Sequence, residues 1–308
     1  MKAVRIHRFG GPEVLQLDEV GPPTASDGKL IIGVKAASVN PVDYKIRSGR
    51  YPKVTAADLP MTLGRDVAGV VEAAAGGFAA GDEVYAHLDW ADGGYAQVAL
   101  CAPGGVALKP KSLDMVAAAA VPLAATTAWQ GLFDHGGLEP GGRVLIHGAS
   151  GGVGAFAVQF ARRAGAEVIA TASAEAIGRV RSLGAAQVID YGAQRFEDEV
   201  SDLDLVFDLI GGDTQKRSFA ALRRGGRLVS TVEEPDQDQA AARGVTALRY
   251  MAEPNAAQLS TFARLIDSGE VEVSVAKVFH LGDAANAHRC LEGHHPRGKV
   301  VLKIPGRM

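Results

Sequence analysis

Residues 143–154, RVLIHGASGGVG, form the stretch that decides the expected fold. The first five residues are a compact apolar run typical of a buried strand, and a helical pattern begins at Val153. A glycine-rich turn that leaves a strand and opens a helix is the setting of a dinucleotide-binding motif. In such a motif, Gly151 lets backbone approach a pyrophosphate and Gly154 lets the helix pack closely on the strand, while the helix N-terminus presents unpaired N–H groups.

We therefore predict that this turn holds a dinucleotide, with contacts from Ala149, Ser150, Gly151, Gly152, Val153 and Gly154. Ala149 stands where the motif has its first glycine. The turn has neither the lysine nor the Ser/Thr of a P-loop, which argues against nucleotide hydrolysis. His147, within the predicted strand, is more typical of a satisfied core or cofactor-lining residue than of a catalytic base.

Strands and helices continue to alternate after the turn. Short apolar runs indicate strands at 167–171, 188–190, 203–208 and 227–231, and helical patterns cover 153–163 and 175–183. This alternation predicts right-handed βαβ units and an α/β fold with a doubly wound parallel sheet of the Rossmann kind.

The first 120 residues have a different character. They indicate strands at 29–36, 66–73 and 83–87 joined by proline-containing loops, and no helical period precedes 113–120. Near the other end, 256–268 form an amphipathic helix pattern and 298–304 a strand pattern. We expect this last strand to return to the first domain, because no room is left for a third.

Composition limits the class of protein. A chain of 308 residues that is 47% hydrophobic is long enough for two domains, and its net charge of −3 argues against nucleic acid or an anionic membrane as partner. The start of the chain lacks the apolar stretch of a signal peptide, and the longest apolar run, 115–125, is too short to span a bilayer. We expect a cytoplasmic protein.

Cys101 and Cys290 are isolated, which argues against a disulfide framework or a four-cysteine zinc lobe.

The end of the second strand of the predicted sheet indicates which cofactor binds. NAD-binding sites place Asp or Glu there for the ribose 2′-hydroxyl, whereas this chain has Ala172 followed by Ser173. No carboxylate would repel a 2′-phosphate, and Ser173 and Tyr191 can donate to one. Arg179 or Arg181 would have to supply the cation. We predict NADPH.

Five segments in order through the chain support a family resemblance: VNPVDYKIRSG (39–49), LGRDVAG (63–69), ASGGVG (149–154), FDLIGG (207–212) and RGKVVL (297–302). Together they resemble the zinc-free quinone oxidoreductase branch of the medium-chain dehydrogenases/reductases, which includes zeta-crystallin. The resemblance runs nearly from end to end.

This resemblance implies a split architecture. A GroES-like, mainly-β catalytic domain would consist of 1–123 and 254–308, and a Rossmann dinucleotide-binding domain of 124–253, with the active site in the cleft. It also implies that Thr127 lies close to the nicotinamide, and we assign Ile210 of the fourth segment to the cofactor site. A homodimer is usual in the family, and 245–250 is a plausible edge strand for it.

Zinc-dependent relatives hold their catalytic zinc with a cysteine where this chain has Asn40, and with Gly-His-Glu where it has Gly64, Arg65 and Asp66. Their third ligand would fall near Leu123. Neither an asparagine nor an arginine is a credible replacement for these soft ligands, so we expect no metal.

Without zinc, hydride transfer needs substrates that are already electrophilic, such as quinones and α,β-unsaturated carbonyls. A few donors must then stabilise the developing oxyanion. The candidates are Asn40, through its amide, and Tyr51, which matches the tyrosine that serves as proton donor in enoyl-thioester reductases of this superfamily. Tyr44 lies nearby, and Asp43 is more typical of a residue that pins the loop than of a catalytic acid.

Two alternatives stay open. A 2-enoyl-thioester reductase would need a basic groove for the carrier phosphate, and the sequence shows none that we can identify. A non-catalytic NADPH-binding protein, structural or RNA-associated, is known in the branch, but the charge balance gives no support for RNA.

Overall fold

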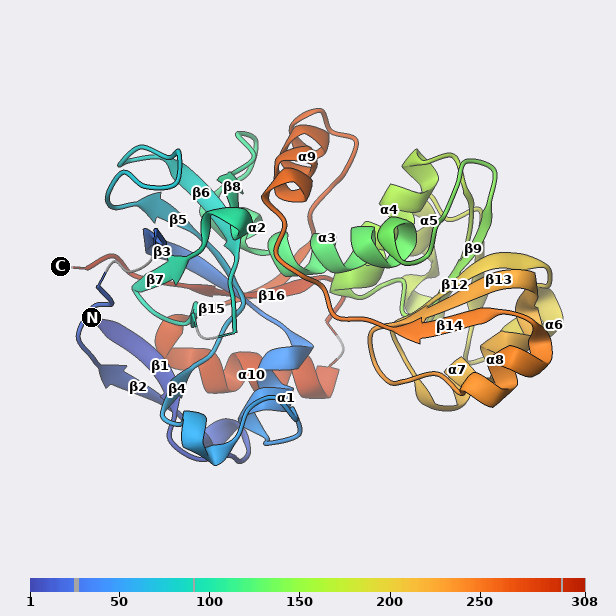
Figure 1. Ribbon diagram of the computed structural model, residues 1–308, viewed down its shortest axis with the longest axis horizontal. Coiled ribbons are helices and arrows are strands. Elements are labelled where there is room, and N and C mark those ends of the chain that lie inside the picture. Colours follow the sequence, from blue (N-terminus) through green and yellow to red (C-terminus); the bar gives the residue numbers. More distant parts are fainter. Residues whose placement is uncertain (25–27, 91, 295, 308) are drawn as a thin grey trace. The chain divides into compact units, whose positions relative to one another are not determined.

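The computed structural model describes residues 1–24, 28–90, 92–294 and 296–307. The chain forms two compact units, one made of Met1–Leu123 with Pro254–Met308 and one of Ala124–Glu253 (Figure 1). The first unit is thus discontinuous in sequence, and the second is a continuous insertion into it.

A six-stranded parallel sheet forms the centre of the second unit, in the order β11-β10-β9-β12-β13-β14. The chain runs outward from β9 to β10 and β11, then returns to place β12 on the other side of β9. This confirms the doubly wound sheet expected from the sequence, with its switch point at the carboxyl ends of β9 and β12. The strands are β9 (Arg143–Ile146), β10 (Glu167–Ala172), β11 (Gln187–Asp190), β12 (Leu203–Asp208), β13 (Leu222–Ser230) and β14 (Thr246–Arg249).

Helices cover both faces of this sheet, with α4 and α5 on one side and α7 and α8 on the other (Figure 1). Leu145, Ile169, Val206 and Leu228 come from four adjacent strands and share one buried cluster with Phe219. Each such side chain contributes about 1.5–3 kcal/mol through burial. The helical segments are α3 (Pro122–Trp129), which leads into the unit, a π-helix (Gln130–Asp134), α4 (Gly152–Arg163), η5 (Ala174–Ala176), α5 (Ile177–Ser182), α6 (Phe196–Glu199), α7 (Gly212–Ser218), η6 (Phe219–Ala221) and α8 (Gln237–Arg243).

The first unit is mainly β, as expected. Its larger sheet has the order β15-β16-β3-β5-β6-β8, with β7 also paired to β3, and a smaller sheet has the order β2-β1-β4. All pairs are antiparallel except β15 with β16. The strands are β1 (Lys2–Ile6), β2 (Leu15–Glu19), β3 (Leu30–Val39), β4 (Met61–Thr62), β5 (Asp66–Val71), β6 (Glu83–His87), β7 (Val98–Cys101), β8 (Val106–Leu108), β15 (Val275–His280) and β16 (Lys299–Lys303).

The expectation that no helix precedes 113–120 is wrong. A helix, α1 (Pro41–Arg47), follows β3 directly. It is too short to show a period, and it is fixed instead by Pro41 at its first position and by the Asp43 carboxylate, which accepts the Asn40 N–H at 2.8 Å. The other helical segments of this unit are η1 (Pro12–Val14), η2 (Ala56–Asp58), η3 (Pro103–Gly105), α2 (Met115–Ala119), α9 (Ala256–Asp267), η7 (Leu281–Asp283) and α10 (Ala284–His294).

The last strand returns to the first unit, as expected. β16 lies between β15 and β3, with Val300 opposite Val39 and Lys303 opposite Ala36. This register brings Lys299, at the start of β16, next to Asn40, the residue after Val39.

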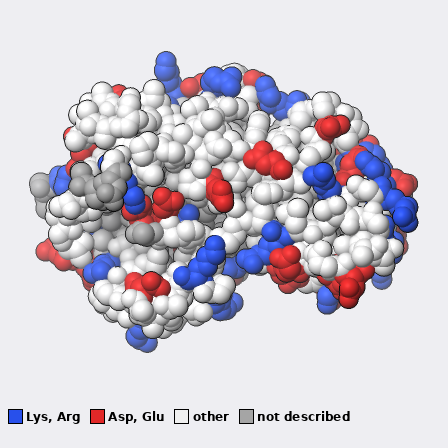
Figure 2. Space-filling view, in the orientation of Figure 1, with Lys and Arg blue, Asp and Glu red and all other residues white. Residues whose placement is uncertain are grey.

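Within the described ranges, no helix is both long and apolar enough to cross a membrane. On the face that Figure 2 shows, lysine and arginine side chains lie interspersed with aspartate and glutamate.

Candidate functional site

The glycine turn of the second unit runs from the end of β9 into α4. Gly148 has a φ of +71°, a left-handed conformation that favours glycine. A Cβ on Gly154 would lie 2.3 Å from the Gly148 carbonyl oxygen, so the close approach of helix and turn requires a glycine there. Gly151 caps the helix with an ordinary φ of −75°, and a Cβ there would meet only the Gly148 oxygen, at 3.4 Å. Gly148 was therefore missed, although its position after the strand was visible in the sequence.

The turn has the features that a pyrophosphate needs. The N–H groups of Gly152, Val153 and Gly154 belong to the first turn of α4 and have no intrahelical acceptor. Ser150 is partly exposed, whereas Ala149 is fully buried. The helix N-terminus also carries a partial positive charge. The turn thus fits the phosphates of a dinucleotide.

The predicted 2′-phosphate contacts gather at neighbouring strand ends. Ala172 at the end of β10 pairs with Asp190 at the end of β11, so the residues that follow them, Ser173 and Tyr191, leave the sheet side by side. Tyr191 is 67% exposed. Arg179 lies half-buried on α5, which begins four residues after Ser173.

Ile210 and Thr127 occupy other places in the second unit. Ile210 follows β12, is 54% exposed, and lies over the turn, since a Cβ on Gly148 would be 3.1 Å from its Cδ1 atom. Thr127 is on α3, and its carbonyl accepts a hydrogen bond from the Tyr250 hydroxyl. The turn, Ser173, Tyr191 and Ile210 therefore lie at the carboxyl ends of β9 to β12, where ligands of such sheets bind.

His147 is a satisfied core residue. It lies just after β9, is fully buried, and its two ring nitrogens are 3.0 Å from the Thr171 and Ser218 hydroxyls. Burial lowers its pKa to about 4, so the ring is neutral near pH 7.

In the first unit, Asn40 belongs to a buried polar network. Lys299 Nζ donates to Asn40 Oδ1, and Asn40 Nδ2 donates to Asp66 Oδ2 at 2.8 Å. An ammonium has only hydrogens to offer, so the atom facing Lys299 must be the amide oxygen. Ser38 and the Leu123 N–H also donate to the Asp66 carboxylate. Burial lowers the pKa of Lys299, and the Asp66 and Asp43 carboxylates oppose that shift.

Asp43 holds the start of α1. Its Oδ2 atom accepts the Asn40 N–H at 2.8 Å and the Tyr95 hydroxyl at 2.9 Å. Burial raises its pKa to about 6. Tyr95 lies 3.3 Å from His288 Nε2, and His288 Nδ1 lies 3.1 Å from Arg47, so α1 and α10 are tied together. These partners were missed because they come from distant parts of the chain.

Tyr51 is part of an aromatic stack that the sequence did not reveal. Its ring lies 4.7 Å from the Trp90 ring at an angle of 21°, and the Arg65 guanidinium lies 3.7 Å above the centre of the Trp90 ring. Two groups so close to one ring centre cannot share a face, so Trp90 is held between Tyr51 and Arg65. Tyr51 is 6% exposed. Tyr44 is half-buried on α1, and burial raises its pKa.

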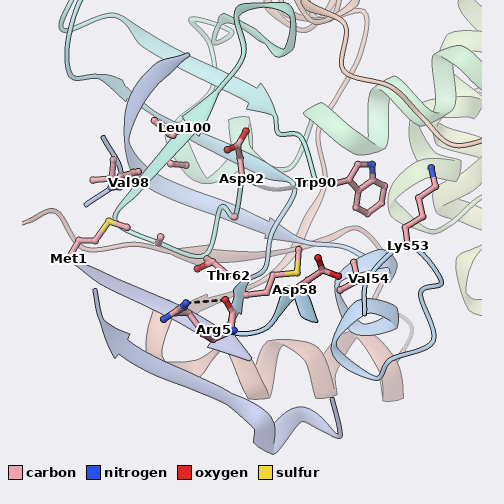
Figure 3. A pocket seen from close by; sticks show the side chains of 16 residues that line it. Met1, Arg5, Lys53, Val54, Asp58, Thr62, Trp90, Asp92, Val98 and Leu100 are labelled. Atoms are coloured by element: carbon pink, nitrogen blue, oxygen red, sulfur yellow. Dashed lines mark hydrogen bonds between the residues drawn. The ribbon is translucent and has the colours of Figure 1, made fainter. Parts of the chain in front are cut away.

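A cavity of about 510 Å³ lies beside this stack, within the first unit (Figure 3). Lys53, Thr62, Trp90 and Val98 help to line it, and Arg5 donates to the Pro60 carbonyl oxygen at 3.0 Å at its edge. Asn40, Tyr44 and Tyr51 are not among its described lining residues. Trp90 is thus a wall shared by the cavity and the stack.

Comparisons with known proteins agree with this arrangement. The family model described as alcohol dehydrogenase GroES-like domain matches residues 26–111, and the one described as zinc-binding dehydrogenase matches 183–302. Human quinone oxidoreductase is 32% identical over 99% of this chain and 98% of its own length. The chloroplastic NADPH-dependent alkenal/one oxidoreductase of Arabidopsis thaliana is 34% identical over 98% of this chain and 79% of its own. The structure of Escherichia coli quinone oxidoreductase complexed with NADPH matches with a TM-score of 0.89 and 29% identity, covering 98% of this chain and 100% of that one.

The chain belongs to the quinone oxidoreductase branch of the medium-chain dehydrogenases/reductases. This confirms the resemblance expected from its five segments, and it makes the protein an oxidoreductase with a GroES-like and a Rossmann-type fold.

Although one family model is described as zinc-binding, the residues of this quinone oxidoreductase-like chain do not fit zinc. Asn40, Arg65 and Leu123 offer an amide, a guanidinium and an alkyl group, and the Lys299 ammonium already binds Asn40. Within the ranges that the structure describes, no group of three His, Cys, Asp or Glu side chains is placed to hold a metal.

Proposed function

We propose that the protein is an NADPH-dependent reductase of quinones or α,β-unsaturated carbonyls that works without zinc. The observation that carries the proposal is the Lys299 ammonium, bonded to Asn40 and 3.8 Å from Asp66, among the positions that hold zinc in metal-dependent relatives. A buried cation repels a divalent metal and uses the oxygen atoms that would otherwise bind one. Substrates must then accept a hydride without a Lewis acid, as quinones and enones do.

The cofactor is assigned to the second unit. In this proposal the first-turn N–H groups of α4 bind the pyrophosphate, Ser173, Tyr191 and Arg179 bind the 2′-phosphate, and Thr127 and Ile210 contact the nicotinamide half. When bound, NADPH would supply the hydride. Support comes from the close turn at Gly148 and Gly154, from the NADPH complex of the Escherichia coli relative and from the NADPH-dependent oxidoreductase of Arabidopsis thaliana.

The substrate is assigned to Asn40, Tyr51 and Tyr44 of the first unit. Tyr51 and Tyr44 carry hydroxyl donors, and the stack on Trp90 holds the Tyr51 ring in place. The Asn40 amide already donates to Asp66, at 2.8 Å, and lies 3.3 Å from the Ser38 hydroxyl. Asn40 can therefore donate to a substrate only by giving up its contacts with the Ser38 hydroxyl and carbonyl oxygens.

The test is oxidation of NADPH and of NADH by the purified protein with quinones, simple enones and 2-enoyl thioesters. We expect turnover with NADPH and a quinone or an enone, unchanged after dialysis against a chelator. Turnover of thioesters alone would replace the proposal by the enoyl-thioester reductase reading. Tight NADPH binding without any turnover would replace it by the non-catalytic one.

A homodimer and a cytoplasmic location are further parts of the proposal. β14 is the last strand of its sheet and leaves one edge for pairing with a second copy. Light scattering of the purified protein tests the dimer.

A further inference from the structure

Arg65 is a buried cation without an acidic partner. Its side chain is 4% exposed, and its Nε atom donates to the Leu88 carbonyl oxygen at 2.8 Å. Among the described residues, this is the only hydrogen bond of the Arg65 side chain, and the guanidinium forms no ion pair. Within the part of the chain that the structure describes, the terminal nitrogens Nη1 and Nη2 have no hydrogen-bond acceptor.

The other strongly buried cations of the first unit are all compensated. Arg47, 2% exposed, forms two hydrogen bonds of 2.9 Å with Glu292. Lys299, 6% exposed, binds Asn40 and lies near Asp66. Carboxylates near Arg65 favour its charge, but none of the described ones forms an ion pair with it, and burying a cation in this way is costly.

Arg65 is also held rigidly. The Leu88 carbonyl fixes Nε, and the Trp90 ring, supported by Tyr51, covers one face of the guanidinium. The planar group keeps two parallel N–H donors at its free end, a geometry suited to an anionic oxygen. Asp43, Asp66 and Asp89 are close enough to favour its charged form, although burial lowers its pKa.

We propose that the free end of Arg65 binds the negatively charged oxygen that forms on the substrate during reduction. This rests on the proposed function. When a hydride from NADPH adds to the β-carbon of an enone, the new C–H bond forms there and the C=C electron pair shifts toward the carbonyl oxygen. The enolate then takes a proton from water or Tyr51, while NADPH becomes NADP⁺. For a quinone the charged oxygen is that of the quinol monoanion.

A phenolate is a stable mimic of this oxygen. We would titrate 4-nitrophenol into the NADP⁺-loaded protein and follow the absorbance of the phenolate. The same titration would be made with Arg65→Met, with Arg65→Lys and with Arg289→Met, a control at an exposed arginine. We expect the native protein and Arg289→Met to bind the phenolate form, Arg65→Met to lose at least ten-fold in affinity, and Arg65→Lys to lie between. The kcat for an enone should fall about 100-fold in Arg65→Met, the usual effect of removing one oxyanion donor.

Two results would overturn the inference. One is equal phenolate affinity in the native protein and both Arg65 variants, with unchanged melting temperatures. The other is a loss of NADPH affinity in Arg65→Met, measured by nucleotide fluorescence, because the guanidinium would then serve a cofactor phosphate. If Arg65→Met does not fold, Arg65→Lys decides alone, since it keeps the charge but not the planar fork. A native protein without turnover sinks the proposed function, whereas the phenolate titration, which needs no activity, still decides whether Arg65 binds an anionic oxygen.

Discussion

Lys299 Nζ donates to Asn40 Oδ1 although 259 positions separate the two residues in the chain. The bond joins the last strand of the first unit to the start of α1. It places a positive charge beside Asp66, where metal-dependent relatives keep zinc ligands. One lysine thus connects the architecture of this unit with the lack of fit to zinc at Asn40 and Arg65.

Replacing Lys299 by Met should lower the free energy of unfolding by about 3–5 kcal/mol, because Asp66 would stay buried without its cation. Lys303→Met is the matched control, since Lys303 lies on the same strand but is exposed. Thermal unfolding followed by circular dichroism measures both. Similar shifts for the two variants would contradict the role of the network.

Gly154→Ala should weaken NADPH binding at least ten-fold. The new Cβ would lie 2.3 Å from the Gly148 oxygen, a contact that only a backbone shift can relieve. Gly178→Ala is the control: Gly178 lies on α5 with nothing within 4 Å of its Cβ position, and alanine there stabilises the helix by roughly 0.5–1 kcal/mol. Titration by nucleotide fluorescence should show normal affinity for the control, and equal losses in both would argue against the turn as the cofactor site.

Ser173→Asp should reduce the affinity for NADPH more than that for NADH. A carboxylate about 4 Å from a phosphate near the surface costs on the order of 4 kcal/mol, which salt weakens. Ser173→Ala removes only one donor and should change the ratio of NADPH affinity to NADH affinity less. Dissociation constants of both nucleotides at two salt concentrations measure the effect. An unchanged ratio in Ser173→Asp would place the 2′-phosphate elsewhere.

Asp43→Asn should remove a pH dependence of stability. Burial raises the pKa of Asp43 from its ordinary 3.8 to about 6, so between these values the folded chain binds more protons than the unfolded chain. Stability from this group is therefore complete below pH 3.8 and is lost as the pH rises to 6, by about 3 kcal/mol. The native-minus-variant difference in unfolding free energy, measured from pH 4 to 7, should fall accordingly.

Asp58→Asn is the control for that experiment. Its native-minus-variant difference in unfolding free energy should change with pH in the opposite direction. Hydrogen bonds from Thr55 lower the pKa of Asp58, so its contribution appears as the pH rises. A difference curve for Asp43→Asn that rises with pH would contradict the buried, proton-holding state.

The sequence was sufficient for the Rossmann-type sheet because its signals are local. Each element has a signal in its own residues: an apolar run at 143–147, a glycine-rich turn after it, and short apolar runs for the strands that follow. The helix α1 gave no such signal, since its seven residues are held by Pro41 and by Asp43 rather than by an apolar face.

The candidate site was less predictable because its contacts are distant in sequence. Asn40, Tyr51 and the segment containing Lys299 could be singled out, but no pattern indicated that Lys299 binds Asn40 or that Trp90 lies between Tyr51 and Arg65. Such pairs arise from the register of β16 on β3 and from side-chain stacking, neither of which leaves a periodic trace in the chain.

The position of β16 has a consequence for synthesis on the ribosome. Ala124–Glu253 is contiguous, so that unit can fold as soon as it has left the exit tunnel. The other unit must wait, because β3 keeps an open edge until Lys299–Lys303, far downstream in the chain, arrive to pair with it. During translation this nascent edge is the segment most prone to pair with another chain, and the one that a chaperone would have to protect.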